Sequence, residues 1–495
     1  MPSHEETPDK RKRRPSSQLR RNLSLCTTEG LVAMPLVYMT LPGNFIVAML
    51  LTKTFPLNET MFGAIASLPA WSNVIQLLLT PLLTRRWSQK AITLFFSWLH
   101  LTSWVTLGLA LPYVPTDDME AAGRLFFLLF ALSALFQSIV GVSWTSWIQE
   151  WVPERIRGKY FGRRNRLLQL STVVFLLTAG EVLTRIDGDN RVLGMQILIL
   201  VAVALRAVSI FLQHRILRTS ERPEREGGHD IRSQMRVMLQ RRPLLWYFAF
   251  GAVFGLANGT FGPFFMVFLY DGLQMPVSEV SMLIVISSVT GAIAMPAWGQ
   301  FLDTHGNRPT MIVALALWML PGFAWALLTP ENTWILKLLY ASGGTFSAGF
   351  ILGQFNFLLK LVPPEAKTAS ISVNLAVTSL TGALAPILGG YLLETAMTAG
   401  YAKLDVYHGM AIIHHAIVPL SGLVLLKVAE PRSASVTRVV GAMRSSRQLF
   451  ALLGLTFLVN YVFTRRGNDL PARRPARAHR SPASPSPEKE NPPRP

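Results

Sequence analysis

The sequence has few charged residues for its length. Asp, Glu, Lys and Arg make up 15% of its 495 residues, whereas an ordinary soluble domain carries about 25%. Half of the residues are apolar, and they occur in blocks of about 20, the length that crosses a hydrocarbon core about 30 Å thick. The shortage of charge therefore excludes an ordinary soluble protein and indicates a protein that crosses a lipid bilayer many times.

Cysteine is nearly absent, and so are the sequence patterns of enzymes. Cys26 is the single cysteine, which excludes a disulfide within the chain. The sequence also lacks a P-loop, a dinucleotide-binding glycine motif, a zinc-protease motif and a nucleophile elbow in the right context. We therefore expect no catalytic residue, no cofactor and no metal site. The lack of a nucleotide-binding motif also argues against a pump driven by nucleotide hydrolysis.

Acidic residues are scarce relative to basic ones, with 28 Asp and Glu against 47 Lys and Arg. Such a basic chain can bind nucleic acid, but here the basic residues lie in loops and tails between apolar blocks, so we expect no nucleic-acid partner. Membrane proteins place their basic loops in the cytoplasm. We therefore expect both termini and residues 215–243 to be cytoplasmic, in the plasma membrane or, in a bacterium, the inner membrane.

The apolar blocks predict twelve transmembrane helices, because backbone groups in lipid must be satisfied within their own segment. Their approximate bounds are 29–52, 61–83, 91–113, 124–149, 167–186, 193–214, 244–270, 279–301, 311–329, 335–359, 369–395 and 408–428. A charged linker at 215–243 separates them into two six-helix bundles, residues 28–214 and 244–428. The predicted fold is an all-α integral membrane protein.

Three further segments flank the bundles. Residues 1–27 and 466–495 are basic and rich in polar residues or proline, and we expect both to be disordered tails. The apolar run at 449–463 is short for a span. We therefore expect residues 429–465 to form an amphipathic or re-entrant helical segment rather than a thirteenth span.

The two bundles are related by an internal repeat. A shift of 220 positions places FPLNE on MPVSE, so that Asn58 and Ser278 occupy the same place, where each is a suitable N-cap. The same shift places the Pro-Gly pair at 42–43 on the Gly-Pro pair at 262–263. After the fourth span of each bundle, VPERIR likewise matches VPPEAK. We conclude that each bundle is one copy of a six-span unit.

The loop after the eighth span resembles a family signature. In GQFLDTHGNR, residues Gly299, Asp303, Gly306 and Arg308 are similar to the Gly-x-x-x-Asp-x-x-Gly-Arg pattern of the major facilitator superfamily of secondary transporters. With its twelve spans and repeat, the chain resembles bacterial-type members over residues 28–430. The second-span copy of the loop has lost its acid, and the fifth span lacks the Gly-Pro signature of drug–proton antiporters.

The resemblance implies that these four residues form a cytoplasmic gate. We expect Gly299 to allow a close approach between helices, Asp303 to face the N-terminus of a helix, and Arg308 to pair with a carboxylate. Together they would hold the two halves against each other in one state of the transport cycle. The alternative is an ordinary polar turn.

Candidate substrate-binding residues lie on the spans that the resemblance places around the cavity. Asn44 and Asn258 lie beside the Gly/Pro breaks of spans one and seven, and such paired breaks point to the binding site of a transporter. Gln137 and Trp144 share one face of span four, and Gln354 belongs to span ten. A helix-packing role is the alternative for each of them.

Few ionisable residues fall within the spans. We expect Glu181 and Arg185 to form a local ion pair one turn apart. Arg206 has no evident partner, and we expect it to extend toward the cytoplasm. His414 and His415 could titrate near neutral pH and couple a proton to transport, although most such histidines are structural.

The resemblance implies secondary active or facilitated transport of a small-molecule substrate by alternating access. The candidate coupling ions are a proton and a sodium ion, and we expect the protein to act in the lipid bilayer as a monomer. The alternative is a non-transporting membrane sensor or scaffold of the same fold.

Overall fold

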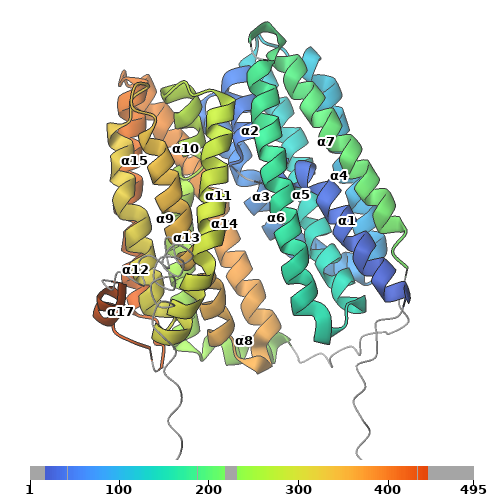
Figure 1. Cartoon of the computed structure of the whole chain (residues 1–495), viewed down its shortest axis with the longest axis vertical. Coiled ribbons are helices and arrows are strands. Elements are labelled where there is room, and N and C mark those ends of the chain that lie inside the picture. Colours follow the sequence, from blue (N-terminus) through green and yellow to red (C-terminus); the bar gives the residue numbers. More distant parts are fainter. Residues whose placement is uncertain (1–16, 42, 187, 218–230, 432, 444–495) are drawn as a thin grey trace, which may run out of the picture.

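The structure is a computed structural model and describes residues 17–41, 43–186, 188–217, 231–431 and 433–443. Within these residues the secondary structure is helical, and the helices form two bundles side by side (Figure 1). The first bundle contains α1 (Ser17–Met39), α2 (Phe45–Met49), the π-helical turn η1 (Leu50–Thr54), α3 (Glu59–Thr84), α4 (Gln89–Ala110), η2 (Leu111–Tyr113), α5 (Met119–Trp151), α6 (Glu154–Arg185), η3 (Gly188–Asn190) and α7 (Arg191–His214).

The second bundle has the same plan. It contains α9 (Arg242–Phe261), α10 (Phe264–Val267), the π-helical turn η4 (Phe268–Gly272), α11 (Val277–His305), α12 (Asn307–Met319), η5 (Leu320–Leu327), α13 (Ile335–Leu361), η6 (Pro364–Ala366), α14 (Lys367–Thr398), α15 (Lys403–Ile417), η7 (Val418–Leu420) and α16 (Ser421–Leu426). Two short helices, α8 (Ile231–Leu239) and α17 (Val436–Met443), lie at the lower end in Figure 1.

The predicted spans correspond to these helices. Eleven helices of the described chain are long and apolar enough to cross a membrane, and a shorter apolar helix covers Phe45–Thr54. The first predicted span, 29–52, is divided between α1 and α2–η1. We expected a disordered tail through residue 27, but α1 begins at Ser17. Residues 444–495 lie outside the described residues, as do both the run at 449–463 and the predicted tail that follows it.

The repeat is present in the backbone. Spans one and seven are both interrupted, and both then continue into a π-helical turn, η1 or η4. After each turn a backbone N–H bonds to the carbonyl five residues earlier, from Phe55 to Leu50 and from Leu273 to Phe268, at 2.9 Å in both cases. Such turns are rare and interrupt regular helix geometry. Their occurrence at matching positions confirms the two related bundles.

The predicted N-caps differ between the copies. Asn58 caps α3 by accepting a hydrogen bond from the backbone N–H of Met61 at 2.8 Å, as we predicted. The prediction for Ser278 is wrong, because α11 already begins at Val277 and Ser278 lies in its first turn. The backbone N–H of Ser278 instead donates to the hydroxyl of Thr184 in the first bundle.

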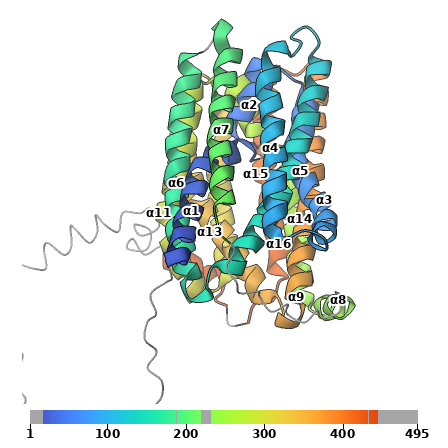
Figure 2. The same ribbon diagram turned by 90° about the vertical axis from the view of Figure 1, so that its right-hand side faces the viewer.

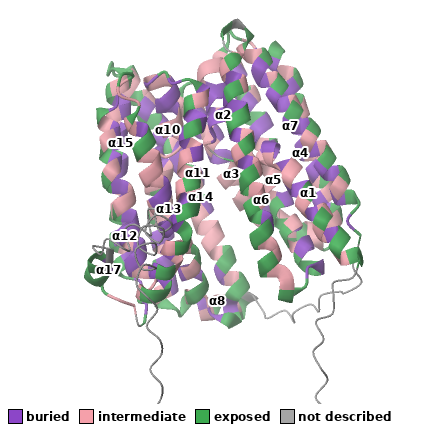
Figure 3. Ribbon diagram, viewed as in Figure 1, coloured by how far each residue is buried: buried purple, intermediate pink, exposed green. Residues whose placement is uncertain are grey.

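The two ends of the bundles differ in how the bundles meet. We call the end with Arg85, Lys90, Arg308 and Lys360 the basic end, and the opposite end the far end. At the far end a single apolar core includes residues of both bundles, and a separate core fills the basic half of each bundle. Figure 1 shows the bundles diverging toward the basic end, and Figure 2 shows the first bundle face on. In Figure 3, α2 and α10 are largely buried where the bundles meet.

Small residues and polar contacts join the bundles at the far end. A Cβ atom at Gly63 of α3 would collide with the carbonyl oxygen of Pro386 of α14, so a glycine is required for this close approach. Lys53 Nζ donates to the carbonyl oxygen of Met275 at 2.8 Å, and Glu394 accepts a hydrogen bond from Asn58 at 3.2 Å. The far end is therefore held by both packing and hydrogen bonds.

Candidate substrate cavity and buried charge cluster

A cavity of about 540 Å³ lies between the bundles, and we call it the central cavity. Gly43, Ala66 and Ala70 of the first bundle line one side, and helices of the second bundle from α9 to α15 line the rest. Small-molecule sites have volumes of about 300–1,000 Å³. The central cavity is therefore large enough to hold a small organic solute.

The lining of the central cavity combines aromatic rings with neutral polar groups. Its polar side chains are Asn258, Ser287, Tyr340, Ser347, His414 and His415. Phe265, Trp318 and Trp325 add apolar aromatic rings, and none of its described lining residues is Asp, Glu, Lys or Arg. His414 and His415 pack edge-on against Phe265, with ring centroids 5.0 and 5.5 Å apart. Such a lining can hold an uncharged solute by ring contacts and neutral hydrogen bonds.

The paired amides Asn44 and Asn258 lie in different environments. The Asn44 side chain accepts from the N–H of Val47 at 2.9 Å and donates to the carbonyls of Met39 and Leu41. It is therefore the N-cap of α2 and holds the break in span one. Asn258 lines the central cavity and makes no side-chain hydrogen bond to the described residues, so its amide is available to a ligand.

The other three candidate residues divide between two places. Gln137 and Trp144 line a second cavity, of about 180 Å³, which lies within the first bundle. We call it the N-bundle cavity. Gln354 lines neither the central nor the N-bundle cavity, and its backbone carbonyl accepts a hydrogen bond from Tyr247 at 2.6 Å. The structure therefore does not bring the five predicted residues together at one site.

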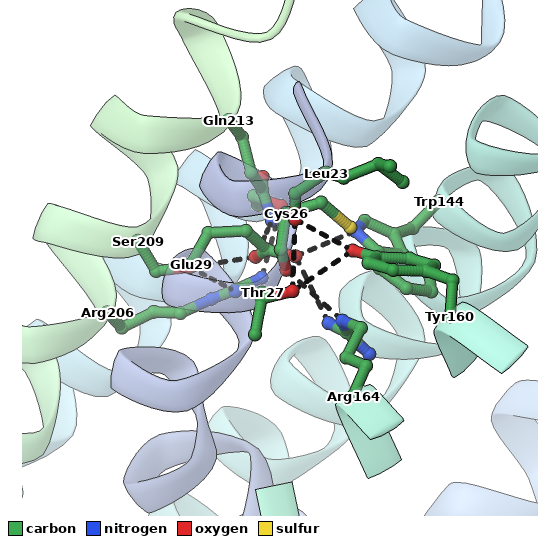
Figure 4. A network of polar contacts seen from close by, with 11 residues as sticks. Leu23, Cys26, Thr27, Glu29, Trp144, Tyr160, Arg164, Arg206, Ser209 and Gln213 are labelled. Atoms are coloured by element: carbon green, nitrogen blue, oxygen red, sulfur yellow. Dashed lines mark hydrogen bonds and ion pairs between the residues drawn. The ribbon is translucent and has the colours of Figure 1, made fainter. Parts of the chain in front are cut away.

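The N-bundle cavity contains a buried carboxylate, Glu29 of α1, which is 2% exposed. Figure 4 shows its side chain surrounded by donors from α5, α6 and α7. Oε1 accepts from Trp144 Nε1 at 3.2 Å and from Arg164 Nη2 at 3.3 Å. Oε2 accepts from Ser209 Oγ at 3.2 Å and from Gln213 Nε2 at 2.9 Å. Glu29 thus ties four helices together.

Arg164 reaches this carboxylate from α6. The predicted spans 124–149 and 167–186 left Arg164 in the loop between them, but α6 begins at Glu154 and Arg164 is buried within the bundle. Its guanidinium stacks on the Trp144 ring at 4.6 Å, and its Nε donates to the carbonyl of Cys26. A Cβ atom at Gly30 would collide with its Nη2 atom, so this approach requires glycine on α1.

Arg206 is a second buried guanidinium in the cluster. We expected it to extend toward the cytoplasm, but it is 3% exposed. Its Nη1 donates to Ser209 Oγ at 3.1 Å and its Nη2 donates to Ser97 Oγ at 3.3 Å. Ser209 also donates to Glu29, so Arg206 reaches the carboxylate only through a hydroxyl.

Sequence reasoning overlooked Glu29 because it stands at the first position of the predicted first span. The signal was available, since an acid within "CTTEGLVAMP" precedes an apolar block without a break. The early start of α1 at Ser17 places Glu29 in mid-helix. Arg164 carried no comparable signal, because it is one of several basic residues in a polar stretch.

The predicted cytoplasmic gate has a different geometry from the one we expected. Asp303 is exposed and makes no hydrogen bond or ion pair with the described residues. Gly299 makes no close approach to a neighbouring helix in this state, because a Cβ atom there would meet no atom within 4 Å. Gly306 adopts φ +96°, a conformation that favours glycine, and a Cβ atom there would also press against Ser433.

The acidic residue that contacts this loop is Glu430, which sequence reasoning did not single out. Its carboxylate accepts from the backbone N–H groups of Asn307 and Arg308, at 3.0 and 2.8 Å, and from Lys360 Nζ at 2.9 Å. Burial alone would raise the pKa of Glu430, but these hydrogen bonds outweigh it and hold the pKa below its ordinary value. Glu430 therefore occupies the positive N-terminus of α12.

Arg308 also acts within the second bundle. Its Nη1 donates to the carbonyl of Val428 at 3.2 Å, beyond the C-terminal end of α16. These contacts join α12, α13 and the segment after α16, rather than one bundle to the other. The separate prediction for Glu181 and Arg185 is confirmed, because they form an exposed ion pair at 2.7 Å.

The comparisons with known proteins agree with this architecture. The family model described as Major Facilitator Superfamily matches residues 31–275 and 248–466. Two repeated helical bundles around a cavity define the class of secondary transporters. The chain belongs to the major facilitator superfamily, and it is a multi-pass membrane transporter of small solutes rather than an enzyme.

Individual relatives are more distant. A multi-drug resistance efflux pump, PmrA of Streptococcus pneumoniae, is 30% identical over 138 residues, and the match covers 27% of this chain and a third (33%) of the relative's length. The nucleoside transporter NupG superposes with a TM-score of 0.60 at 15% identity over 83% of this chain and 100% of its own. A D-xylose-proton symporter gives 0.62 at 14% over 84% and 98%. These solved structures show the fold alone.

Proposed function

We propose that the protein carries a small uncharged solute through the central cavity by alternating access. The uncharged lining of this cavity is the observation that supports the solute class, because a charged solute would need a compensating charge once it left water. The aromatic rings favour a solute with an apolar or ring-shaped part. One chain contributes the whole cavity, so a monomer is sufficient.

The structure fits the state that opens toward the basic end. The shared core and the contacts of Lys53 and Glu394 join the bundles at the far end, whereas the basic halves have separate cores. We propose that the basic end faces the cytoplasm, because basic loops are retained there. The cavity would then be open to the cytoplasm in this state.

A ligand screen followed by a flux assay tests the solute class. Purified protein should be stabilised against heating by some uncharged compounds, and proteoliposomes should transport the same compounds. Asn258→Leu should weaken the apparent affinity by roughly tenfold, as for one lost hydrogen bond in a binding site. Gln354→Leu is the matched amide outside the central cavity and should not. An equal effect of both variants, or stabilisation by anions or cations alone, would contradict the proposal.

Cysteine labelling tests the orientation. In a chain with Cys26 replaced, a cysteine at the exposed position Glu365 of the basic end should resist an impermeant maleimide in intact cells. A cysteine at the exposed position Asp117 of the far end should react. The opposite pattern would invert the proposed topology.

Export of aromatic, drug-like compounds is a second candidate function. The efflux pump PmrA is a relative over part of the chain, and the central cavity contains Phe265, Trp318 and Trp325. Loading such compounds on one side of the membrane and following their exit separates export from uptake. Repeating this assay with and without a pH gradient tests a proton as the coupling ion, for which His414 and His415 are the candidates in the cavity.

A further inference from the structure

The N-bundle cavity contains more positive than negative charge. Glu29, Arg164 and Arg206 are 2%, 7% and 3% exposed, and Glu29 is the one carboxylate among the residues that line the cavity. One carboxylate thus faces two guanidinium groups, which stay protonated in proteins. An uncompensated charge inside a protein is costly, so the excess of one positive charge calls for a counter-ion.

Glu29 cannot supply that compensation to both arginines. A carboxylate has about four lone-pair sites, and Glu29 already accepts from Trp144, Arg164, Ser209 and Gln213. This saturation also leaves no free oxygen lone pair for a cation. The cluster is therefore unsuited to bind a metal ion or sodium.

Arg206 forms no ion pair with the described residues. Two of its donors reach the hydroxyls of Ser97 and Ser209, and its Nε atom is buried with no hydrogen-bond partner in the described part of the chain. Both Arg206 and Arg164 line the cavity. His100, one turn from Ser97 on α4, is fully buried, and neither ring nitrogen has a hydrogen-bond partner among the residues that the structure describes. A proton on His100 would only increase the excess of positive charge.

We propose that the N-bundle cavity binds one small monovalent anion, such as chloride, nitrate or formate, against Arg206 and Arg164. The volume of about 180 Å³ suits such an ion. Gln137, which also lines the cavity, has a side-chain oxygen without a partner and amide donors that could turn toward an anion. This site is separate from the central cavity and does not depend on the proposed solute.

Anion exchange on the purified full-length protein tests the site. At constant ionic strength, replacing gluconate by chloride, nitrate or formate should raise the melting temperature in a saturable manner. Radioactive chloride should bind with one ion per chain, and nitrate and formate should displace it. Arg206→Gln should weaken chloride binding by roughly ten- to hundredfold, as for a lost hydrogen bond to a charged group. Arg206→Lys should retain part of it.

Two controls make the outcome decisive. Arg185→Gln removes an exposed arginine at the far end and should leave chloride binding unchanged. Asn258→Leu alters the central cavity and should also leave it unchanged, so that this site and the proposed solute site fail or succeed separately. If Arg206→Gln does not fold, the displacement experiment on the unmodified protein still decides. Absence of stoichiometric chloride binding, or equal stabilisation by gluconate, would overturn the proposal.

Discussion

Among the described residues, the first bundle buries three charged side chains in its interior, whereas the second bundle buries one, at its basic end. Glu29, Arg164 and Arg206 lie inside the first bundle. The second bundle lines most of the central cavity with neutral groups and places Glu430 at the basic end. The backbones nevertheless match down to a π-helical turn in spans one and seven. The two copies therefore share their helix breaks and π-helical turns, whereas their side chains have different chemical roles.

The largest expected effect comes from removing the buried carboxylate. Glu29→Gln removes the one carboxylate that lines the cavity beside two buried guanidinium groups and should lower the free energy of unfolding by about 3 kcal/mol. The shift that superposes the two π-helical turns places Glu29 on Tyr247, whose hydroxyl donates to the Gln354 carbonyl. Tyr247→Phe should cost only about 1 kcal/mol. Denaturation in detergent measures both, and equal losses would remove the distinction between the bundles.

Asp303→Asn should give the next largest effect, on transport rather than on folding. Asp303 is exposed in this state, but after closure of the basic end it can face a helix N-terminus, a contact that contributes up to about 2 kcal/mol. That energy corresponds to roughly thirtyfold in the ratio of states. The variant should fold normally, transport slowly and show greater labelling at the basic end. Unaltered flux and labelling would identify this stretch as an ordinary polar turn.

Glu430→Gln should destabilise the second bundle by about 1–2 kcal/mol, because the N-terminus of α12 loses its negative partner. The pKa of Glu430 is lowered in the folded protein from the ordinary 4.5, so its contribution is fully present above that pH and is lost as the pH falls through the folded pKa. Melting temperatures measured from pH 6 downward should therefore decline less in the variant. Parallel declines in variant and parent would exclude this role.

The smallest expected difference separates the paired amides. Asn44→Leu removes the N-cap of α2 and should cost about 1 kcal/mol of stability with little change in the apparent affinity for solute. Asn258→Leu should do the reverse, because its side chain makes no hydrogen bond to the described residues and lines the central cavity. Melting temperature and transport affinity, measured on the same preparations, distinguish the two roles. If both variants lost stability and kept the apparent affinity for solute, both residues would serve only to stabilise the helix breaks.

Much of the fold was predictable because the membrane imposes a simple rule. Apolar blocks of the right length must be helices, and the repeat of Gly/Pro breaks gave the two bundles. The candidate site was harder to predict from the sequence. Asn258 lines the central cavity, but Trp144 lines the separate N-bundle cavity, and the Asn44 side chain is bonded to the backbone of its own span. Side-chain partners across the bundle, such as Glu29 with Arg164, depend on helix rotation, which periodicity over a single span does not determine.

The position of Glu430 in the sequence determines when the N-terminus of α12 can be capped during synthesis. The N-terminus of α12 is made 123 residues before its acceptor, and four further membrane crossings, from α12–η5 to α15–α16, separate the two in the chain. During translation, α12 is therefore inserted without this cap, and the backbone N–H groups of Asn307 and Arg308 gain their carboxylate only after α15–α16, the last crossing of the described residues. A ribosome stalled just before residue 430 would leave the second bundle without this contact.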